Sequence, residues 1–298
     1  MKPGALGKGD RIGIIAPGGP VTRDELDAGM RFLESRGHSI VSGSHLYDSR
    51  GYLAGDDEDR LEDLHGMFRN PEVKAILCAR GGYGTLRLLD KIDYPLIRRN
   101  PKIVAGYSDI TALLLALHKM SGLVTFHGPL VKDLAANDNR NMASLLDLMG
   151  SPDPLEWDLQ GALCLRPGRA VGPLLGGNLT LLCHLVGTPY MPSFKGAILV
   201  IEDRGESLYR IDRMLTHLHL SGLLQDLAGL VAGQFEDCGD ASAISDLLED
   251  ATSRPGIPVV AGLPLGHGRT NLPLPLGLKA SLDTDGMTLI LSESCVSA

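Results

Sequence analysis

Short apolar runs alternate with amphipathic stretches along the first half of the chain, a pattern that predicts parallel strands joined by crossover helices. Buried strands are expected at 11–16, 39–41, 73–79 and 102–106, and helices at 56–69, 85–92 and 109–119. A further helix is expected after Thr22, which forms a capping box with Glu25 three positions later. The first half is therefore predicted to be an α/β domain built on a parallel sheet.

The second half is less regular, and its topology is left open. Strand-like runs occur at 197–201, 227–233, 258–261 and 287–291, with helical patterns at 178–186 and 209–220. Between these halves the pattern loosens, and Asn137-Asp138-Asn139, Ser151-Pro152-Asp153-Pro154 and Pro167-Gly168 read as turns or loops. At roughly 150 residues per domain, 298 residues suggest two domains. We predict an N-terminal domain at 1–135, a linker at 136–170 and a C-terminal domain at 171–298.

Composition and charge narrow the class of protein. The chain is 44% hydrophobic and 21% charged, as in ordinary globular proteins. A net charge of -8 without a dense Lys/Arg run argues against a nucleic-acid partner, because phosphate binding needs clustered positive charge. No apolar segment has the length of a signal peptide or a membrane span. We expect a cytoplasmic protein with no membrane partner.

Cysteine and histidine spacings give no sign of a metal site. The five cysteines stand far apart, which suggests neither a zinc site nor a disulfide framework, and Cys78 lies in a predicted core strand. His217 and His219 are two apart on a predicted helix and face different ways. No metal is expected.

Ser108 is the candidate nucleophile. It stands where a predicted strand ends and a helix begins, so its hydroxyl would be exposed and the next backbone N–H would point into the same space. The motif departs from the Gly-x-Ser-x-Gly elbow at Ile110. Ser108 could instead be the N-cap of the following helix, and both interpretations stay open.

The glycine loop Arg80-Gly81-Gly82-Tyr83-Gly84 follows another predicted strand and would lie at the same sheet edge as Ser108. It fails the dinucleotide-binding pattern at Arg87, and the chain has no Gly-x-x-x-x-Gly-Lys-Ser/Thr loop for phosphates. An oxyanion-binding loop and a plain turn are both compatible with it.

A serine nucleophile needs a base that is oriented by a carboxylate. Among nine histidines, His267 is the best candidate because glycines flank it in a loop after an apolar run; His127 is the second. Glu202 and Asp203 follow the run 197–201, and they would point to opposite sides if the strand continues. The alternatives are a plain surface histidine and a salt bridge from Glu202 to Arg204 or Arg210.

Taken together, these stretches resemble the L,D-carboxypeptidase family of serine peptidases, which includes murein tetrapeptide carboxypeptidases and microcin C immunity peptidases. The resemblance spans nearly the whole chain. It rests on these motifs, in the family's order: Gly9-Asp10-Arg11 to Ala16-Pro17, Arg80 to Gly84, Gly106-Tyr107-Ser108-Asp109, His127-Gly128-Pro129, Gly176-Gly177-Asn178-Leu179, Ile201-Glu202-Asp203 and Gly266-His267-Gly268.

The resemblance implies a catalytic triad. Ser108 attacks the carbonyl, His267 transfers the proton, and Glu202 orients the imidazole. The backbone N–H groups of Asp109 and Gly82 are expected to form the oxyanion hole, and no metal or organic cofactor is implied. Arg80, Tyr83 and Asn178 are expected to bind substrate, Arg80 as a cation for the terminal carboxylate unless it pairs with a structural acid.

The implied substrate is a murein peptide, from which the enzyme releases terminal D-alanine during cell-wall recycling. The implied fold is an N-terminal flavodoxin-like domain and a smaller β-rich C-terminal domain, in a homodimer. Within the family, an immunity-type peptidase would cleave a peptidyl-nucleotide and would want an aromatic platform, for which Trp157 is a candidate.

Two readings from other classes stay open. A non-catalytic protein could keep the cleft for binding a wall peptide, although the complete Ser, Glu and His set argues against this. A glutaminase of the amidotransferase type would share the first-half fold, but that chemistry requires a cysteine at position 108.

Overall fold

The structure is a computed structural model that describes residues 1–136, 139–253 and 256–297. The chain forms two compact units. The first contains Met1–Pro152, Leu272–Pro275 and the C-terminal segment from Cys295; the second contains Asp153–Asn271 and Leu276–Ser294. The predicted turn residues Asn137 and Asp138 lie outside the described residues. The predicted limits of the domains stay a prediction.

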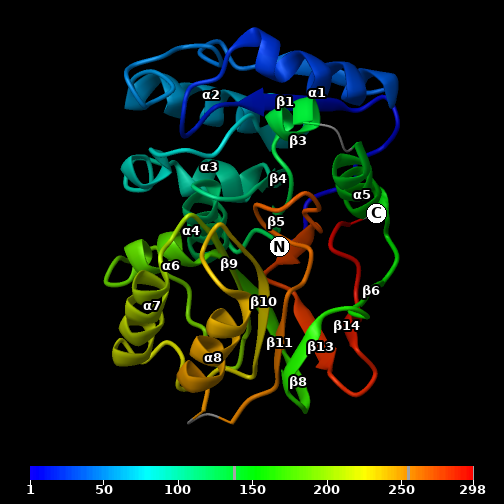
Figure 1. Cartoon of the computed structure of the whole chain (residues 1–298). Helices are drawn as coiled ribbons and strands as arrows, with labels where there is room; N and C mark the ends of the chain where they lie inside the picture. Colours follow the sequence, from blue (N-terminus) through cyan, green and yellow to red (C-terminus); the bar gives the residue numbers. More distant parts are fainter. Residues whose placement is uncertain (137–138, 254–255, 298) are drawn as a thin grey trace. The chain divides into compact units, whose positions relative to one another are not determined.

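The first unit is built on a six-stranded sheet in the order β12-β5-β4-β3-β1-β2. Strands β2, β1, β3, β4 and β5 pair in parallel, which is the flavodoxin strand order and confirms the predicted fold class. Figure 1 labels β1, β3, β4 and β5 of this sheet. The bounds of the strands are β1 Arg11–Ile15, β2 Ser39–Ser42, β3 Val73–Cys78, β4 Ile103–Gly106, β5 Thr125–His127 and β12 Leu274–Leu276.

Five α-helices and two 3₁₀ turns complete this unit. They are α1 Arg23–Ser35, α2 Asp57–Arg69, η1 Thr85–Arg87, α3 Tyr94–Arg99, α4 Ile110–Ser121, η2 Val131–Ala136 and α5 Asn139–Gly150. The predicted capping box of Thr22 and Glu25 begins α1. Every residue of β4 is buried, as its continuous apolar sequence requires in a sheet that is covered on both faces.

The helix predicted at 85–92 is wrong. Only one 3₁₀ turn forms at Thr85–Arg87, and the helix that follows is α3, which begins at Tyr94. Asp93 caps α3 by accepting a hydrogen bond from the Leu96 N–H at 2.8 Å, and Pro95 suits the first turn of a helix. Thr85 is held by bonds to Asp109, so long-range contacts override the local helical preference.

The second unit contains a mixed eight-stranded sheet in the order β6-β14-β13-β8-β9-β10-β11-β7. The four central strands β8, β9, β10 and β11 are parallel, and the outer pairs are antiparallel. This agrees with the predicted β-rich α/β domain. The strands are β6 Leu155–Asp158, β7 Leu163–Arg166, β8 Arg169–Asn178, β9 Ile198–Arg204, β10 Gly229–Glu236, β11 Val259–Ala261, β13 Lys279–Asp283 and β14 Thr288–Leu291.

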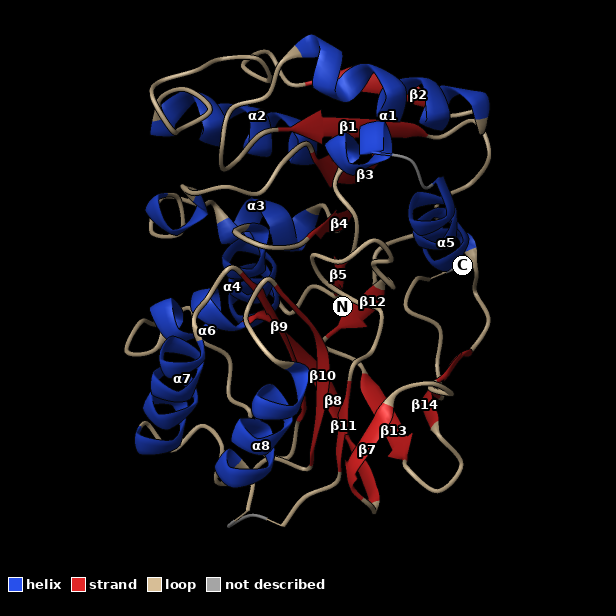
Figure 2. Cartoon of the chain, viewed as in Figure 1, coloured by secondary structure: helices blue, strands red, loops and turns tan. Residues whose placement is uncertain are grey.

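Three helices lie beside the parallel strands of this sheet, as Figure 2 shows. They are α6 Leu179–Leu185, α7 Leu208–Leu220 and α8 Ala241–Ala251. The sequence predicted α6 and α7 but not α8. It also missed β8, whose C-terminal half contains Gly176 and Gly177, and the stretch 136–170 predicted as a linker holds α5, β6 and β7.

The sequence also predicted that Cys78 is buried and that no helix spans a membrane. Cys78 is fully buried in β3, as predicted, and burial raises the pKa of its thiol far above the usual range. Among the helices of the described ranges, none is long and apolar enough to cross a membrane.

Replacing Gly176 by alanine is expected to destabilise the protein by at least about 3 kcal/mol. Gly176 has a φ of +138°, and an added Cβ would lie 1.9 Å from the Val200 carbonyl oxygen of the neighbouring strand. Gly196→Ala is the matched control, because Gly196 has a φ of +69° but open space around it. Urea unfolding should show a far smaller loss for Gly196→Ala; equal losses would contradict this account.

Candidate active site

The predicted site residues fall into two groups, one in each unit. The first group surrounds Ser108, which lies between β4 and α4 and is partly exposed. Ser108 has a φ of 63°, in the left-handed region that non-glycine residues rarely adopt. Such a conformation costs of the order of 1–3 kcal/mol, so the surroundings must hold it in place.

Ser108 is not the N-cap of α4. That position belongs to Asp109, and the Thr111 N–H donates to the backbone oxygen of Ser108. The capping interpretation is therefore wrong. The strained turn presents the serine at the carboxyl end of a parallel strand, where a nucleophile elbow is found.

The glycine loop lies directly against Ser108. A Cβ added at Gly81 would lie 3.0 Å from the Ser108 Cβ and 3.1 Å from its Oγ. The Gly19 N–H donates to the Gly81 oxygen at 2.8 Å, so the loop after β1 and the loop after β3 are in contact. The strand order reverses between β1 and β3, which is where open parallel sheets bind ligands.

Gly82 and Asp109 carry the two predicted oxyanion donors. Gly82 is exposed, has a φ of 97°, and an added Cβ would lie 3.0 Å from the Cα of Gly19, so a side chain there would be strained and crowded. Asp109 is the N-cap of α4, and a backbone N–H at that position has no acceptor within the helix. Their roles as oxyanion donors stay predictions.

The carboxylate of Asp109 is buried and ties the elbow to the glycine loop. It accepts a hydrogen bond from the Thr85 N–H at 3.0 Å, and the Thr85 hydroxyl donates to the Asp109 backbone oxygen at 2.6 Å. Burial raises the pKa of Asp109, while these donors and Arg60 oppose that rise. No pattern along the chain pointed to this link.

Arg80 and Tyr83 are part of the glycine loop. The Arg80 Nη1 donates to the Pro20 oxygen at 3.0 Å and lies 4.0 Å from a Glu25 carboxylate oxygen, so Arg80 does pair with a structural acid. Tyr83 is exposed and packs edge-on against the exposed Tyr52, with ring centroids 5.5 Å apart. Their predicted contacts with substrate stay predictions.

The second group centres on a hydrogen-bonded pair in the second unit. The His267 Nδ1 lies 2.7 Å from the Glu202 Oε2. Glu202 is fully buried near the end of β9, and burial raises its pKa while the bond to His267 lowers it. With Nδ1 donating to the carboxylate, Nε2 is the basic nitrogen of the ring.

The loop that carries His267 is shaped around this pair. Gly266 has a φ of 102°, and an added Cβ would lie 2.4 Å from the Glu202 Oε2. The Gly266 N–H donates to the Asn271 side chain at 2.9 Å, and Gly268 lies against Gln234. Sequence reasoning missed Asn271 and Gln234. The glycines on both sides of His267 were the only signal for this close packing.

Strand β9 continues through Glu202 and Asp203, and both carboxylates contact Asn178, but Glu202 also bonds to His267 and Asp203 to Thr180. Asp203 accepts bonds from the Asn178 Nδ2 at 2.9 Å and from the Thr180 hydroxyl at 2.8 Å. Asn178 also caps α6 through the Leu181 N–H. Asn178 thus has a structural role, and its predicted contact with substrate stays a prediction.

The structure also shows the partners of Arg204 and Arg210 and the position of His127. Arg204 pairs with Asp237 and Arg210 with Glu206, so the salt bridge proposed as an alternative for Glu202 is wrong. His127, the second candidate base, is fully buried at the end of β5 with its ring 5.9 Å from that of Tyr107. His267 is partly exposed and stays the predicted base.

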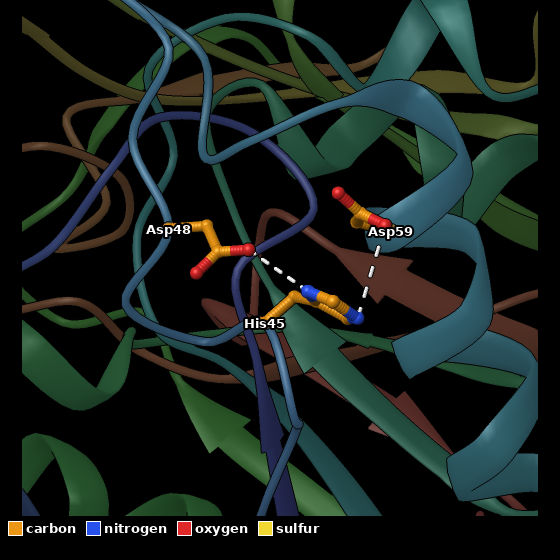
Figure 3. Close-up of side chains that lie close together, drawn as sticks. All are labelled: His45, Asp48 and Asp59. Atoms are coloured by element: carbon orange, nitrogen blue, oxygen red, sulfur yellow. Dashed lines mark hydrogen bonds and ion pairs between the residues drawn. The ribbon is translucent and has the colours of Figure 1, made fainter.

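One cluster in the described part of the chain could be considered for a metal: His45, Asp48 and Asp59 (Figure 3). The His45 Nδ1 lies 2.8 Å from an Asp48 oxygen, and its Nε2 lies 3.8 Å from an Asp59 oxygen. The two carboxylates face opposite ring nitrogens, an arrangement that suits a protonated imidazole rather than ligands converging on one ion.

Comparisons with known proteins cover nearly the whole chain. Residues 12–128 match the LD-carboxypeptidase N-terminal domain, and residues 171–282 match the LD-carboxypeptidase C-terminal domain. A relative from Bacillus subtilis, "Probable murein peptide carboxypeptidase", is 42% identical over 97% of this chain and 94% of its own length.

Two solved structures are similar. A muramoyltetrapeptide carboxypeptidase from Oxalobacter formigenes has a TM-score of 0.83 and 34% identity, covering 94% of this chain and 97% of its own. The microcin C7 self-immunity protein MccF in complex with aspartyl sulfamoyl adenosine has a TM-score of 0.92 and 26% identity, covering all of both chains.

The His45 cluster predicts a pH-dependent contribution to stability. The bond to Asp48, and then the charges of Asp59 and Asp63, raise the pKa of His45. This stabilisation is complete below the unfolded pKa of about 6.5 and is lost as the pH rises through the folded pKa. The melting temperature of the unmodified protein should exceed that of His45→Gln near pH 6, and the gap should close near pH 8.5.

His217→Gln, at an exposed position on α7, serves as the control and should show no such closing gap. A gap that is constant with pH would contradict the assignment. A rise in melting temperature with added zinc that requires His45 would instead indicate a metal site.

Proposed function

The chain belongs to the LD-carboxypeptidase family, and from that premise we propose that it is a serine-type L,D-carboxypeptidase that releases terminal D-alanine from murein tetrapeptide. The observation that carries this proposal is the 2.7 Å bond between His267 and the buried Glu202, because it supplies an oriented base. The strained, partly exposed Ser108 supports it as the nucleophile.

In the proposed reaction, the Ser108 hydroxyl attacks the carbonyl of the bond between diaminopimelate and D-alanine. The His267 Nε2 takes the proton and then gives it to the leaving amine of D-alanine, which leaves an acyl-enzyme. Water, deprotonated by His267, hydrolyses that ester and restores Ser108. The proposal requires Ser108 from the first unit and His267 from the second to act on one substrate.

Glu202 stabilises the imidazolium that forms in both steps. The carboxylate has no exposed surface, so its interaction with the charged ring is little screened by water. Burial raises the pKa of Glu202, and the bond to His267 opposes that rise. The role of Glu202 is therefore to orient and charge-balance the base.

The oxyanion that develops on the attacked carbonyl would be bound by the N–H groups of Asp109 and Gly82. The absence of a side chain at Gly81 and Gly82 lets a substrate backbone approach Ser108 closely. Arg80 is proposed to meet the terminal carboxylate of the substrate. That role requires it to exchange its weak 4.0 Å pairing with Glu25 for the ligand.

The proposal extends to the substrate, the cellular compartment and the oligomeric state. The B. subtilis relative carries the name of a murein peptide carboxypeptidase, and we propose a murein peptide as the partner molecule here. Recycling of wall fragments in the cytoplasm, by a homodimer without a metal or organic cofactor, completes the proposal.

A second candidate function is cleavage of a peptidyl-nucleotide, favoured by the likeness to MccF bound to aspartyl sulfamoyl adenosine. Trp157 is a poor aromatic platform for the base, because it is buried in β6, where it pairs with Leu289. Tyr52 and Tyr83 are exposed and better suited. Hydrolysis of a peptidyl-adenylate analogue, with no release of D-alanine from tetrapeptide, would favour this function.

Ser108→Ala is expected to abolish D-alanine release from a meso-diaminopimelate tetrapeptide, measured by mass spectrometry. Removal of a triad member leaves at most a residual rate, with losses of about 10⁶-fold in a related type of triad. Undiminished release would rule out Ser108 as nucleophile. If the unmodified protein releases no D-alanine, the murein assignment fails; a binding role follows if the peptidyl-nucleotide also stays uncut.

Glu202→Gln is expected to lower kcat by about 10²- to 10⁴-fold with a small change in KM, because an amide cannot balance the imidazolium charge or enforce the tautomer. Asp203→Asn is the control on the adjacent residue, which shares the Asn178 contact with Glu202 but bonds to Thr180 rather than to His267. Steady-state kinetics should leave Asp203→Asn much closer to the unmodified enzyme. The reverse order would remove Glu202 from the mechanism.

A further inference from the structure

A buried arginine lies behind the two loops that meet at Ser108. Arg60, in the first turns of α2, has a side chain that is 1% exposed. Its Nη1 donates to the Pro17 carbonyl oxygen in the loop after β1, and its Nη2 lies 2.6 Å from an Asp57 carboxylate oxygen. A fully buried cation is costly unless it is paired and hydrogen-bonded, so Arg60 is held by specific local contacts.

The same guanidinium shapes the end of the glycine loop. Gly84 has a φ of 137°, and a Cβ added there would lie 2.6 Å from the Arg60 Nη1 and 2.8 Å from the Leu53 side chain. The Ala54 N–H also donates to the Gly18 oxygen at 3.0 Å. The segment 53–60 therefore contacts both the loop after β1 and the loop after β3.

Asp57 fixes Arg60 from the other side. Its carboxylate accepts from the Arg87 Nε at 2.9 Å and Nη2 at 3.0 Å, and it lies 3.5 Å from the Lys91 Nζ. The hydrogen bonds from Arg87 and, after them, the bond from Arg60 hold the pKa of Asp57 at about 2, against the effect of burial. An anion shared by two arginines at neutral pH is a rigid anchor between α2 and η1.

Arg60 also acts on the residue that follows Ser108. Its positive charge lowers the pKa of the buried Asp109 carboxyl, against the effect of burial. An ionised Asp109 is the stronger acceptor for the Thr85 N–H, which closes the glycine loop on the elbow. Arg60 is thus connected to Ser108 in two ways: by its contacts with the two loops, and by its charge acting on Asp109.

We propose that Arg60 is a positioning residue of the peptidase reaction, which sets the spacing of the glycine loop and the loop after β1 around Ser108. This inference rests on the proposed function of Ser108. Arg60 acts through Pro17, Gly84 and Asp109 and does not touch the substrate.

The test compares Arg60→Met with Lys102→Met. Lys102 is a buried cation of the same unit, and it donates to the backbone oxygens of Asn70 and Val73. These residues lie at the N-terminal ends of β3 and β4, whereas Ser108 follows the C-terminal end of β4, so Lys102→Met controls for general destabilisation. Arg60→Met should lower kcat for tetrapeptide by about 100-fold with KM within about threefold, as expected when reacting groups are misplaced. Lys102→Met should retain kcat within about threefold even where it lowers the melting temperature.

Arg60→Lys keeps the charge beside Asp57 but cannot also reach Pro17 with a planar fork, so it covers the case in which Arg60→Met does not fold. It should lower kcat by about tenfold at unchanged KM. Equal kcat for Arg60→Lys, or equal losses for Arg60→Met and Lys102→Met, would overturn the inference.

Amide hydrogen exchange separates this inference from the proposed function, because it needs no substrate. In Arg60→Met or Arg60→Lys, exchange should quicken in 80–88 and 106–112, whereas Lys102→Met should affect 70–74 and 101–105. If the unmodified enzyme releases no D-alanine, the proposed function is contradicted, but the effect of Arg60 on the loops is still tested by the exchange rates. Unchanged exchange at 80–88 in the Arg60 variants would sink the positioning role.

Discussion

The contact between Gly81 and Ser108 is the constraint on which the rest of the first unit depends. A serine with a φ of 63° persists only if its neighbours leave it no other conformation. Gly81 lies so close to Ser108 that a Cβ added to it would be 3.0 Å from the Ser108 Cβ. The Gly19 N–H, in the loop after β1, donates to the Gly81 oxygen. A side chain at Gly81 would press on the serine and one at Gly19 would press on the Gly81 oxygen, so the elbow and both loops are closely packed against one another.

Both units contain buried or nearly buried carboxylates that are held by hydrogen-bond donors. Glu202 and Asp109 are carboxylates whose pKa values are raised by burial and drawn back by hydrogen-bond donors. Asp57, with two arginines around it, has a lowered pKa instead. Each of these acids is held by named donors, which gives the site groups fixed orientations at the cost of desolvation.

Local sequence was a good guide wherever local forces decide the structure. The apolar runs of β1, β3 and β4 and the capping box of α1 appear where the pattern predicted them. The prediction failed at 85–92, where Thr85 is bound by Asp109 from 24 positions away, and at β8, where glycines interrupt the strand pattern. Such elements are set by partners distant in the chain, which a local window does not contain.

The sequence alone therefore determined the α/β class, the strand-to-helix turn at Ser108 and the strand that carries Glu202 and Asp203. The motif order also identified the family, and that likeness pointed to His267 and Glu202. Only the tertiary structure decided that Glu202 is paired with His267 rather than Arg204, that Ser108 is not a helix cap, and that Arg60 is buried behind the glycine loop. The physical reason is that patterns along a chain encode which face is apolar, whereas hydrogen bonds between distant residues depend on how the chain folds back on itself.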